Sequence, residues 1–277
     1  MKIRKKRKLV ILAHIFLILL VVITLYPIVF SVANSFKTQK EIYGNVLSII
    51  PKNPTLDNYA LITSKIPYFK IVFNTFFIAA VVMIFKLLTS FVVAYTFVYL
   101  KFPFKNTVYF ILICTMFIPF SVTMIPNYIT ISKLNLLDTL WGVLLPQLSD
   151  AMGIFMFRQQ MRTIPMSLIE VARVEKTPHY KIMGTIVLPI VRPAIISQGI
   201  IFFINSWNEY VWPRLILKSE EVYTLSLALQ KFVNAEGGPD MSISMAMATA
   251  TMILPLILFT CCQKHIMSTF ASSGIKG

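Results

Sequence analysis

Few side chains of this 277-residue chain could do catalytic chemistry. Its histidines, His14, His179 and His265, are scattered, and no grouping of His with Asp, Ser or Cys typical of a catalytic site appears. The chain has no Gly-x-x-x-x-Gly-Lys-Ser/Thr loop, so it is not expected to bind ATP by that route. The sequence therefore predicts no cofactor or metal site and no enzymatic activity in this chain.

Two charged residues, Lys86 and Asp150, stand inside long apolar runs. A charge at the centre of a bilayer costs at least about 2.5–3.5 kcal/mol, so each side chain is expected to face the protein interior or water. Counting along helices at about 1.5 Å per residue places the two at similar depths. They could form a structural ion pair or extend to the membrane surface, or they could line a solute pathway.

A second polar group ends another apolar run and comprises Asn205, Asn208 and Glu209. These residues could supply polarity at a membrane interface, or they could contact a solute or a soluble partner. Aromatic residues follow closely: Trp207, Tyr210 and Trp212. Because amphipathic rings prefer the membrane–water interface, we expect this aromatic cluster at the outer interface.

The elements that carry these residues are predicted to be membrane helices. Apolar residues make up 57% of the chain and charged residues only 13%, which excludes an ordinary soluble domain. A bilayer-spanning helix needs about 20 apolar residues, and six stretches qualify. They are residues 9–36, 69–100, 107–131, 140–161, 182–210 and 243–263. The first is longer than the apolar core of about 7–15 residues in a signal peptide, so it is interpreted as a permanent helix. The predicted fold class is an all-α membrane protein with six transmembrane helices in one domain, residues 1–277.

The basic residues predict the orientation. The formal net charge is +15, and no polar domain is long enough to bind nucleic acid. With the N-terminus inside, sixteen Lys and Arg are cytoplasmic and nine are external, as the positive-inside rule requires. Both termini are then cytoplasmic. The sizeable loops are a cytoplasmic one, 162–181, and two external ones, 37–68 and 211–242.

The cytoplasmic loop contains two predicted helix starts. Ser167-x-x-Glu170 has the spacing of a capping box. Thr177 followed by Pro178 predicts a second start, with Thr as the N-cap and Pro in the first turn. Two short helices joined near Lys176 would form a rigid handle for a soluble partner.

Residues 164–193 resemble the EAA loop of importer-type ABC transporter permeases. The matching residues are Glu170-Val171-Ala172 and Ile186-Val187-Leu188-Pro189. The resemblance implies an ATPase-coupling site of Ser167, Glu170, Val171, Ala172, Arg173, Glu175, Lys176, Thr177, Pro178 and Pro189.

Individual roles and two departures follow from this resemblance. Glu170 would pair with an arginine of the ATPase, and the small Ala172 would let a partner surface approach. Arg173 and Glu175 could form a solvated pair. Val171 replaces the first family Ala. Lys176 replaces the family Gly, which predicts strain or a different turn.

Four further segments are similar to carbohydrate permeases, among them the smaller permease of the maltose transporter. They are Pro54–Tyr59, Asn135–Pro146, Asn205–Pro213 and Ser273–Gly277. The resemblance thus covers nearly the whole chain. It implies the ABC importer type I permease fold and import of an oligosaccharide or related carbohydrate by alternating access, in the bacterial cytoplasmic membrane.

The implied partners are membrane lipid, a second homologous permease, two ATPase subunits that bind ATP and Mg, and an external solute-binding protein. The candidate pathway residues are Lys86, Asp150, Asn205, Asn208 and Glu209. The candidate contacts with the binding protein are Glu236, Gly237, Gly238, Pro239 and Asp240.

Rival functions stay open. Lys86 could favour an acidic sugar, so the alternative solute is a charged saccharide or a phosphorylated polyol. A membrane-embedded enzyme would need polar residues clustered at one depth, which the sequence lacks. A passive anchor would need none of the sizeable loops.

Overall fold

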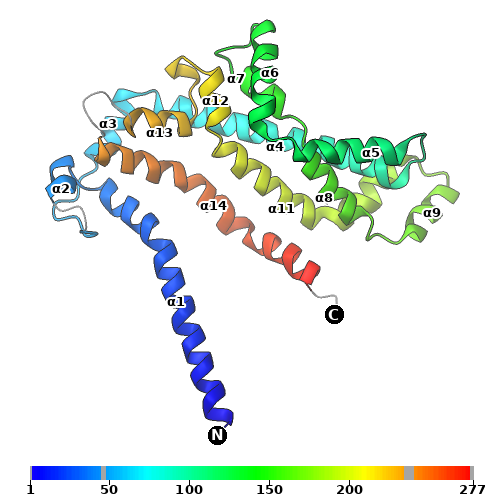
Figure 1. Cartoon of the computed structure of the whole chain (residues 1–277), viewed down its shortest axis with the longest axis horizontal. Coiled ribbons are helices and arrows are strands. Elements are labelled where there is room, and N and C mark those ends of the chain that lie inside the picture. The colour runs from blue at the N-terminus through cyan, green and yellow to red at the C-terminus, as the bar shows by residue number, and fades with distance from the viewer. Residues whose placement is uncertain (1, 45–47, 234–239, 275–277) are drawn as a thin grey trace. The chain divides into compact units, whose positions relative to one another are not determined.

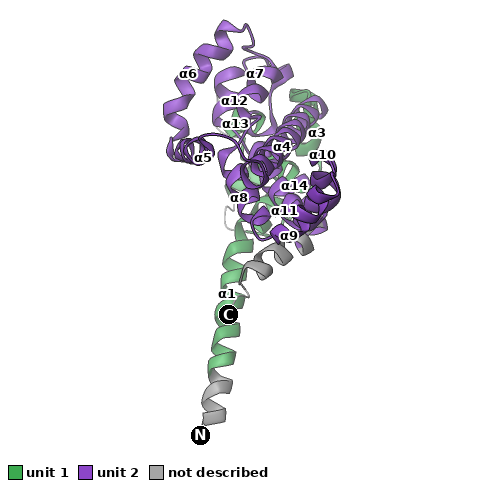
Figure 2. Ribbon diagram, turned by 90° about the vertical axis from the view of Figure 1, so that its right-hand side faces the viewer, with its two compact units in different colours: residues 1–68, 228–253 green, residues 69–227, 254–277 purple. Residues whose placement is uncertain are grey.

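The computed structural model describes residues 2–44, 48–233 and 240–274, with the backbone alone at residues 2–8, 262 and 264–274. Every regular element in these ranges is a helix (Figure 1). The all-α fold class is therefore confirmed for the described part of the chain. Two compact units, coloured separately in Figure 2, make up the chain. Unit 1 contains residues 1–68 and 228–253, and unit 2 contains residues 69–227 and 254–277.

Unit 1 is built around the first apolar helix. Its elements are α1 (Lys2–Ser35), α2 (Gln39–Gly44), α3 (Asp57–Lys65), the end of α13 (Leu225–Val233) and the first part of α14 (Met241–Gly274). In α1, the stretch Leu9–Ser35 is long and apolar enough to cross a membrane. Most of its large apolar side chains are exposed, as suits a helix whose solvent is lipid.

Asn58 closes the end of α1 within unit 1. Its Nδ2 donates to the carbonyl oxygens of Ser35 and Lys37 at 2.7 and 2.8 Å. The hydroxyl of Tyr59 lies 2.7 Å from Oγ of Ser35. The last carbonyls of a helix have no partner within the helix, so these bonds satisfy groups that would otherwise need water. The Pro54–Tyr59 segment thus positions the chain that leaves α1.

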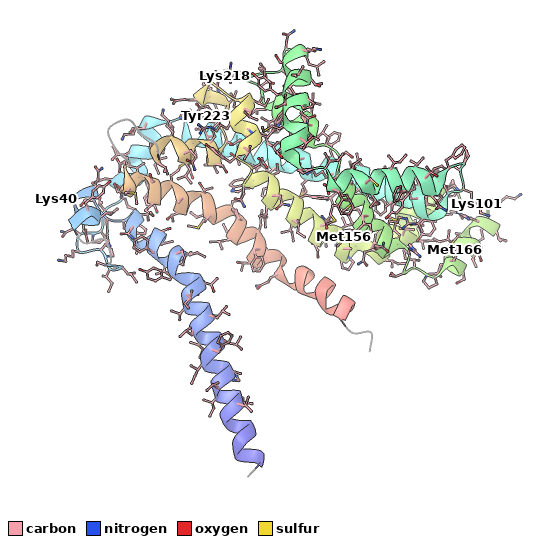
Figure 3. The ribbon with its side chains drawn as sticks, in the orientation of Figure 1. Lys40, Lys101, Met156, Met166, Lys218 and Tyr223 are labelled. Atoms are coloured by element: carbon pink, nitrogen blue, oxygen red, sulfur yellow. The ribbon has the colours of Figure 1, made fainter. Side chains whose placement is uncertain are left out.

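Unit 2 contains the remaining helices. They are α4 (Tyr68–Tyr99), α5 (Lys105–Cys114), α6 (Phe120–Lys133), α7 (Leu140–Leu144), α8 (Ala151–Met161), α9 (Met166–Val174), α10 (His179–Ile182), α11 (Leu188–Trp207) and α12 (Val211–Ile216). Helix α8 packs against α5 and α11, and α12 packs against α6 and α7 (Figure 1). Figure 3 shows Lys101 and Met166 at one end of this unit, far from Lys218 and Tyr223.

Among the described residues, four helical stretches are long and apolar enough to span a membrane without a sharp bend. They are Leu9–Ser35, Tyr68–Tyr99, His179–Ile216 and Met241–Cys261. The expected fifth span, 182–210, therefore extends at both ends, and the run from α10 to α11 includes a π-helical stretch, Met183–Val187. Two bent helix pairs raise the number of candidate spans to as many as six.

The third and fourth stretches are not the continuous helices that the sequence predicted. The third, expected at 107–131, bends by 99° between Phe117 and Phe120. The fourth, expected at 140–161, bends by 42° between Gln147 and Ala151. At the first break, Pro119 lacks the N–H that a continuous helix needs and clashes with the preceding turn. At the second break, Asp150 has an extended backbone and its side chain caps the helix that follows.

The chain between α12 and α13, expected within an external loop, is held by ordered contacts. The Asp138 carboxylate accepts the N–H groups of Lys218 and Ser219 at 2.7 and 2.9 Å. The hydrogen bond from the Ser219 hydroxyl, together with these two backbone bonds, holds the pKa of the Asp138 carboxyl below its ordinary value. Lys70 at the start of α4 forms an ion pair with Glu221, 3.0 Å between Nζ and Oε2.

Gly142 in α7 leaves no room for a side chain. A Cβ there would lie 2.2 Å from the Leu136 carbonyl oxygen and 2.9 Å from Cγ2 of Ile216. We expect Gly142→Ala to destabilise the protein by about 1–3 kcal/mol, because backbone must move to admit the methyl group. Thermal unfolding in detergent measures the change. Gly184→Ala is the matched control, since nothing beyond its own stretch of helix lies within 4 Å of its Cβ position. Equal losses in both variants would contradict this packing argument.

Candidate functional site

Helix α9, between α8 and α10, has two distinct faces. Ile169 and Ala172 point inward and are 0% and 6% exposed. The outward residues follow the spacing i, i+3, i+4, i+7 of one helical face: Ser167, Glu170, Val171 and Val174. Two of these outward residues are apolar and strongly exposed, Val171 at 60% and Val174 at 83%. We call this set of four residues the outward stripe.

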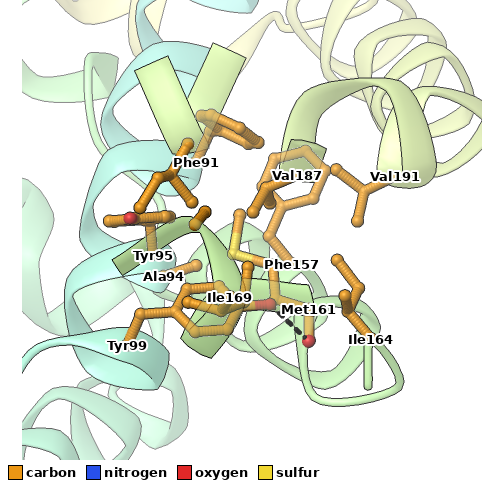
Figure 4. Close-up of a cluster of buried hydrophobic side chains, with 12 residues drawn as sticks. Phe91, Ala94, Tyr95, Tyr99, Phe157, Met161, Ile164, Ile169, Val187 and Val191 are labelled. Carbon is orange, nitrogen blue, oxygen red and sulfur yellow. Dashed lines mark hydrogen bonds between the residues drawn. The ribbon is translucent and has the colours of Figure 1, made fainter. Parts of the chain in front are cut away.

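The inward face of α9 joins a buried cluster at the end of α4 (Figure 4). Its members are Phe91, Ala94, Tyr95, Tyr99, Phe157, Met161, Ile164, Ile169, Ala172, Ile182, Val187 and Val191. The phenolic hydroxyl of Tyr99 donates to the Met161 carbonyl at 2.9 Å, shown dashed in Figure 4. The sequence interpretation of Ala172 as a contact for a partner surface is therefore corrected. Its small side chain lets α9 approach its own unit.

Hydrogen bonds to α4 hold both α9 and the start of α10 in place. The Arg173 guanidinium donates to the carbonyl of Tyr99, the last residue of α4. A cation at a helix C-terminus satisfies an unpaired carbonyl and favours the local dipole. Arg173 thus bonds to α4, and no ion pair joins it to Glu175, contrary to the expected solvated pair. The Tyr95 hydroxyl lies 2.9 Å from Nδ1 of His179.

Sequence reasoning missed Tyr95, Tyr99 and His179. The available signal was the spacing of the two tyrosines, one helical turn apart at the end of an apolar helix. Without the fold, nothing indicated that His179 would meet the first of them.

The turn after α9 has a left-handed residue, Lys176, with φ 57°. Its N–H donates to the Arg173 carbonyl at 2.9 Å, and the Thr177 N–H donates to the Ala172 carbonyl at 3.0 Å. These two bonds form a Schellman motif, in which the left-handed position usually holds Gly. Of the two expectations, strain or a different turn, the structure has the strained one: Lys adopts the conformation that favours Gly.

Both expected N-caps are wrong in detail. Helix α9 begins at Met166 after Pro165, and no side chain caps it, so Ser167 and Glu170 form no capping box. Helix α10 begins after Pro178, one residue later than a Thr177 cap would place it. In each case a proline takes the cap position and sets the entry of the chain through its restricted φ. Pro189 stands in the first turn of α11, directly after the π-helical stretch Met183–Val187.

Lys176→Gly is expected to stabilise the segment by about 0.5–1 kcal/mol. The left-handed conformation costs an L-residue roughly 1–2 kcal/mol, part of which the greater freedom of unfolded Gly offsets. Hydrogen exchange of the α9 and α10 amides measures the change. The matched control is Lys181→Gly within α10, expected to destabilise by about 1 kcal/mol. Faster exchange in Lys176→Gly would contradict the strain argument.

A second candidate site in unit 2 is a pocket of about 340 Å³. Two predicted pathway residues line it, Lys86 from α4 and Glu209 from the link between α11 and α12. The other lining residues are Phe120, Thr123, Asn127, Pro146, Gln147, Ser149 and Trp212. The rings of Phe120 and Trp212 meet edge to face, with centroids 6.2 Å apart. Aromatic surface with several hydrogen-bonding groups is the composition of a small-molecule site.

Asp150 does not pair with Lys86, so the ion-pair interpretation is wrong. Its Oδ2 accepts the Gly153 N–H at 2.8 Å and caps α8. It lines a different pocket of about 330 Å³, which shares Ser149 with the first. Lys86 Nζ lies 5.4 Å from the ring centroid of Phe202.

The remaining predicted residues lie elsewhere. Asn205 and Asn208 are exposed and line neither pocket. Trp207 and Trp212 are 1% and 2% exposed, so their rings pack within the protein. Among the expected contacts with the binding protein, Glu236, Gly237, Gly238 and Pro239 lie outside the described residues. Asp240 caps α14 by accepting the Ile243 N–H at 3.2 Å.

Comparisons with known proteins agree with this arrangement. The family described as "Binding-protein-dependent transport system inner membrane component" matches residues 86–270. The sn-glycerol-3-phosphate transport system permease protein UgpE of Agrobacterium fabrum is 29% identical, covering 92% of this chain and 93% of that protein. The arabinooligosaccharides transport system permease protein AraQ of Bacillus subtilis is 30% identical, covering 95% and 94%.

A solved structure has the same fold. It is a crystal structure of a bacterial ABC transporter involved in the import of the acidic polysaccharide alginate. The TM-score is 0.84 at 21% identity, covering 94% of this chain and 97% of that one. The chain belongs to the family of binding-protein-dependent transport system inner membrane components. It is a multi-pass membrane protein and a transport subunit with the ABC importer permease fold.

Proposed function

We propose that this chain is the permease subunit of an ATP-driven importer that carries an oligosaccharide or related carbohydrate across the bacterial cytoplasmic membrane. The relatives are named for sn-glycerol 3-phosphate and for arabinooligosaccharides, and the similar structure for alginate. A carbon chain rich in hydroxyl groups is common to all three. The lining of the first pocket suits such a solute, because amide and hydroxyl groups bond to hydroxyls and flat rings pack against carbon.

The observation that carries the proposal is the outward stripe of α9. Exposed valines on a short helix between two spans find no lipid core in the proposed topology, so they call for a protein partner. The charged Glu170 lies in the same stripe. A cleft in an ATPase subunit that receives this helix would bury the valines and pair Glu170 with an arginine. The residues from Ser167 to Pro178 form the coupling element.

The inward face would carry the movement into the membrane. Arg173 and the buried cluster tie α9 to the end of α4, and Tyr95 ties α10 to the same helix. Helix α4 has neither Pro nor Gly between Tyr68 and Tyr99, so it can move as one rod. Movement of the ATPases would rock this rod and expose the pocket to one side of the membrane and then the other.

The complete transporter would contain further subunits. Two ATPase subunits bind ATP and Mg, a second homologous permease completes the pathway, and an external binding protein delivers the solute. In this proposal both termini and the α9–α10 segment are cytoplasmic, with six spans if each bent pair counts as one. The end of unit 2 with Lys218 and Tyr223 is external.

Topology is the first test of this proposal. Reporter fusions after Lys101, after Lys176 and at the C-terminus should all report a cytoplasmic location, because basic residues concentrate in those segments. A fusion after Lys218 serves as the control and should report the outside. An external signal at Lys176 would contradict docking of α9 on an ATPase.

Reconstitution is the second test. The chain is assembled in vesicles with a second permease, ATPase subunits and a binding protein from the same organism, and uptake of labelled oligosaccharides is followed with and without ATP. ATP-dependent uptake that needs this chain is the expected result. Uptake that persists without this chain would refute the proposal.

A further inference from the structure

We propose that Lys86 determines the solute class, and that the solute carries an acidic group, a carboxylate or a phosphate, on a hydroxyl-rich body. This inference rests on the proposed function and names the solute of the same pocket.

The Lys86 ammonium has no hydrogen bond or ion pair to the described residues. Its contact is with the face of the Phe202 ring, 5.4 Å from Nζ to the centroid. An ammonium group has three donors, and a ring face satisfies none of them as a hydrogen-bond acceptor would. Lys86 nevertheless lines the pocket from the middle of an apolar helix, where a cation is costly.

The two nearby carboxylates are already engaged at helix starts. Glu209 Oε1 accepts the Trp212 N–H at 3.2 Å at the beginning of α12. Asp150 Oδ2 accepts the Gly153 N–H at 2.8 Å at the beginning of α8 and lines the other pocket. Both lie within electrostatic range of Lys86, so they reduce the cost of its charge without bonding to it. Helix N-termini favour negative charge and hold both carboxylates in place.

An acidic group on the solute would complete this arrangement. A carboxylate or phosphate at Lys86 supplies the missing acceptor, and charge-assisted hydrogen bonds of this kind are about twice as strong as neutral ones. The polar side chains on the rest of the wall meet the hydroxyls: Thr123, Asn127, Gln147 and Ser149. A neutral saccharide would offer the half-buried ammonium only hydroxyl acceptors, without the opposite charge that a carboxylate or phosphate brings.

The test uses pairs of solutes that share a hydroxyl-rich body and differ in the acidic group. Tri-galacturonate is compared with its methyl ester, and sn-glycerol 3-phosphate with glycerol, in vesicles that contain the complete transporter and its binding protein. Affinity of the isolated binding protein for each solute is measured separately, so that its selectivity can be divided out. The variants are Lys86→Gln, Lys86→Arg and the control Lys70→Gln, which removes the same charge from the exposed start of α4.

We expect Lys86→Gln to lower uptake of the acidic member of the transported pair by about tenfold or more, the scale of one charge-assisted hydrogen bond. Lys86→Arg should restore most of the uptake, and Lys70→Gln should leave it unchanged. Whether galacturonate or glycerol phosphate shows the effect distinguishes a carboxylate from a phosphate.

Two results would overturn the inference. One is uptake of neutral saccharides that exceeds uptake of the matching acidic saccharides, once the selectivity of the binding protein has been divided out. The other is acidic uptake that Lys86→Gln leaves unchanged. In both cases the importer function would stand. Absence of ATP-dependent uptake of every saccharide and polyol tried would instead refute the proposed function, and this inference with it.

Discussion

Glu170→Lys is expected to abolish ATP-driven uptake while the protein remains folded and inserted in the membrane. Glu170 lies in the outward stripe and has no ion pair among the described residues, so the substitution should cost the isolated chain little. In the complex it would place a cation against the arginine expected on the ATPase. Like charges juxtaposed at an interface cost several kcal/mol. The measurement is co-purification of the ATPase together with uptake in reconstituted vesicles.

Two companion variants separate the parts of this contact. Glu170→Gln removes the charge and keeps the shape, so it should weaken coupling less than Glu170→Lys. Val174→Asp leaves Glu170 intact and replaces the most exposed valine of the outward stripe, which is 83% exposed, with a carboxylate side chain. It should also uncouple the ATPase, because burying that charge in a cleft is unfavourable. Near-normal uptake in both Glu170→Lys and Val174→Asp would exclude α9 as the coupling element.

Ala172→Asp is expected to impair the folding of the protein, whereas Glu170→Lys is expected to leave it folded. Ala172 is 6% exposed and belongs to the cluster that binds α9 to the end of α4. A carboxylate there would be buried without a partner, which costs several kcal/mol or forces the helix out of its position. We expect less folded protein in the membrane and faster proteolysis between Arg162 and Lys181.

Val174→Asp is the matched control for this prediction, because it introduces the same residue two positions away on the opposite face. It should keep the yield and the protease resistance of the unaltered protein. Ala172→Ser, which adds one small hydroxyl, should lie between the two. If Ala172→Asp gives a normal yield but loses the ATPase, Ala172 faces the partner after all, as the sequence alone suggested.

Local patterns explain what could be predicted of the coupling segment. Two short helices joined at Lys176 were expected, and both exist. Their first residues were predicted less well, because Ser167 and Thr177 compete for the cap position with the prolines beside them. Sequence spacing could place Glu170 and Val174 on one face. It could not say whether that face or the face of Ala172 turned toward the protein, since both carry small or apolar residues.

The contacts of the predicted pathway residues could not be predicted from the sequence. Lys86 and Asp150 are the charges that stand out in apolar runs, and equal depth made a pair plausible. Asp150 instead follows a helix break, where its nearest donor is the Gly153 N–H. A local bond three residues away needs no particular tertiary arrangement, so it prevails over an ion pair that requires two helices to meet at one angle.

The sequence by itself determined that the protein lies in lipid, that its fold is all-α and which family it belongs to. Apolar runs of about 20 residues and the motif at Glu170 each lie within one stretch of chain, so they can be recognised without the fold. Only the tertiary structure decided which residues share a site. Tyr95 and His179 are 84 positions apart, and Lys86 shares its pocket with Glu209 from the distant link between α11 and α12. Such pairs depend on the angles at which helices pack and break, and these angles follow from side-chain fit across the whole of unit 2.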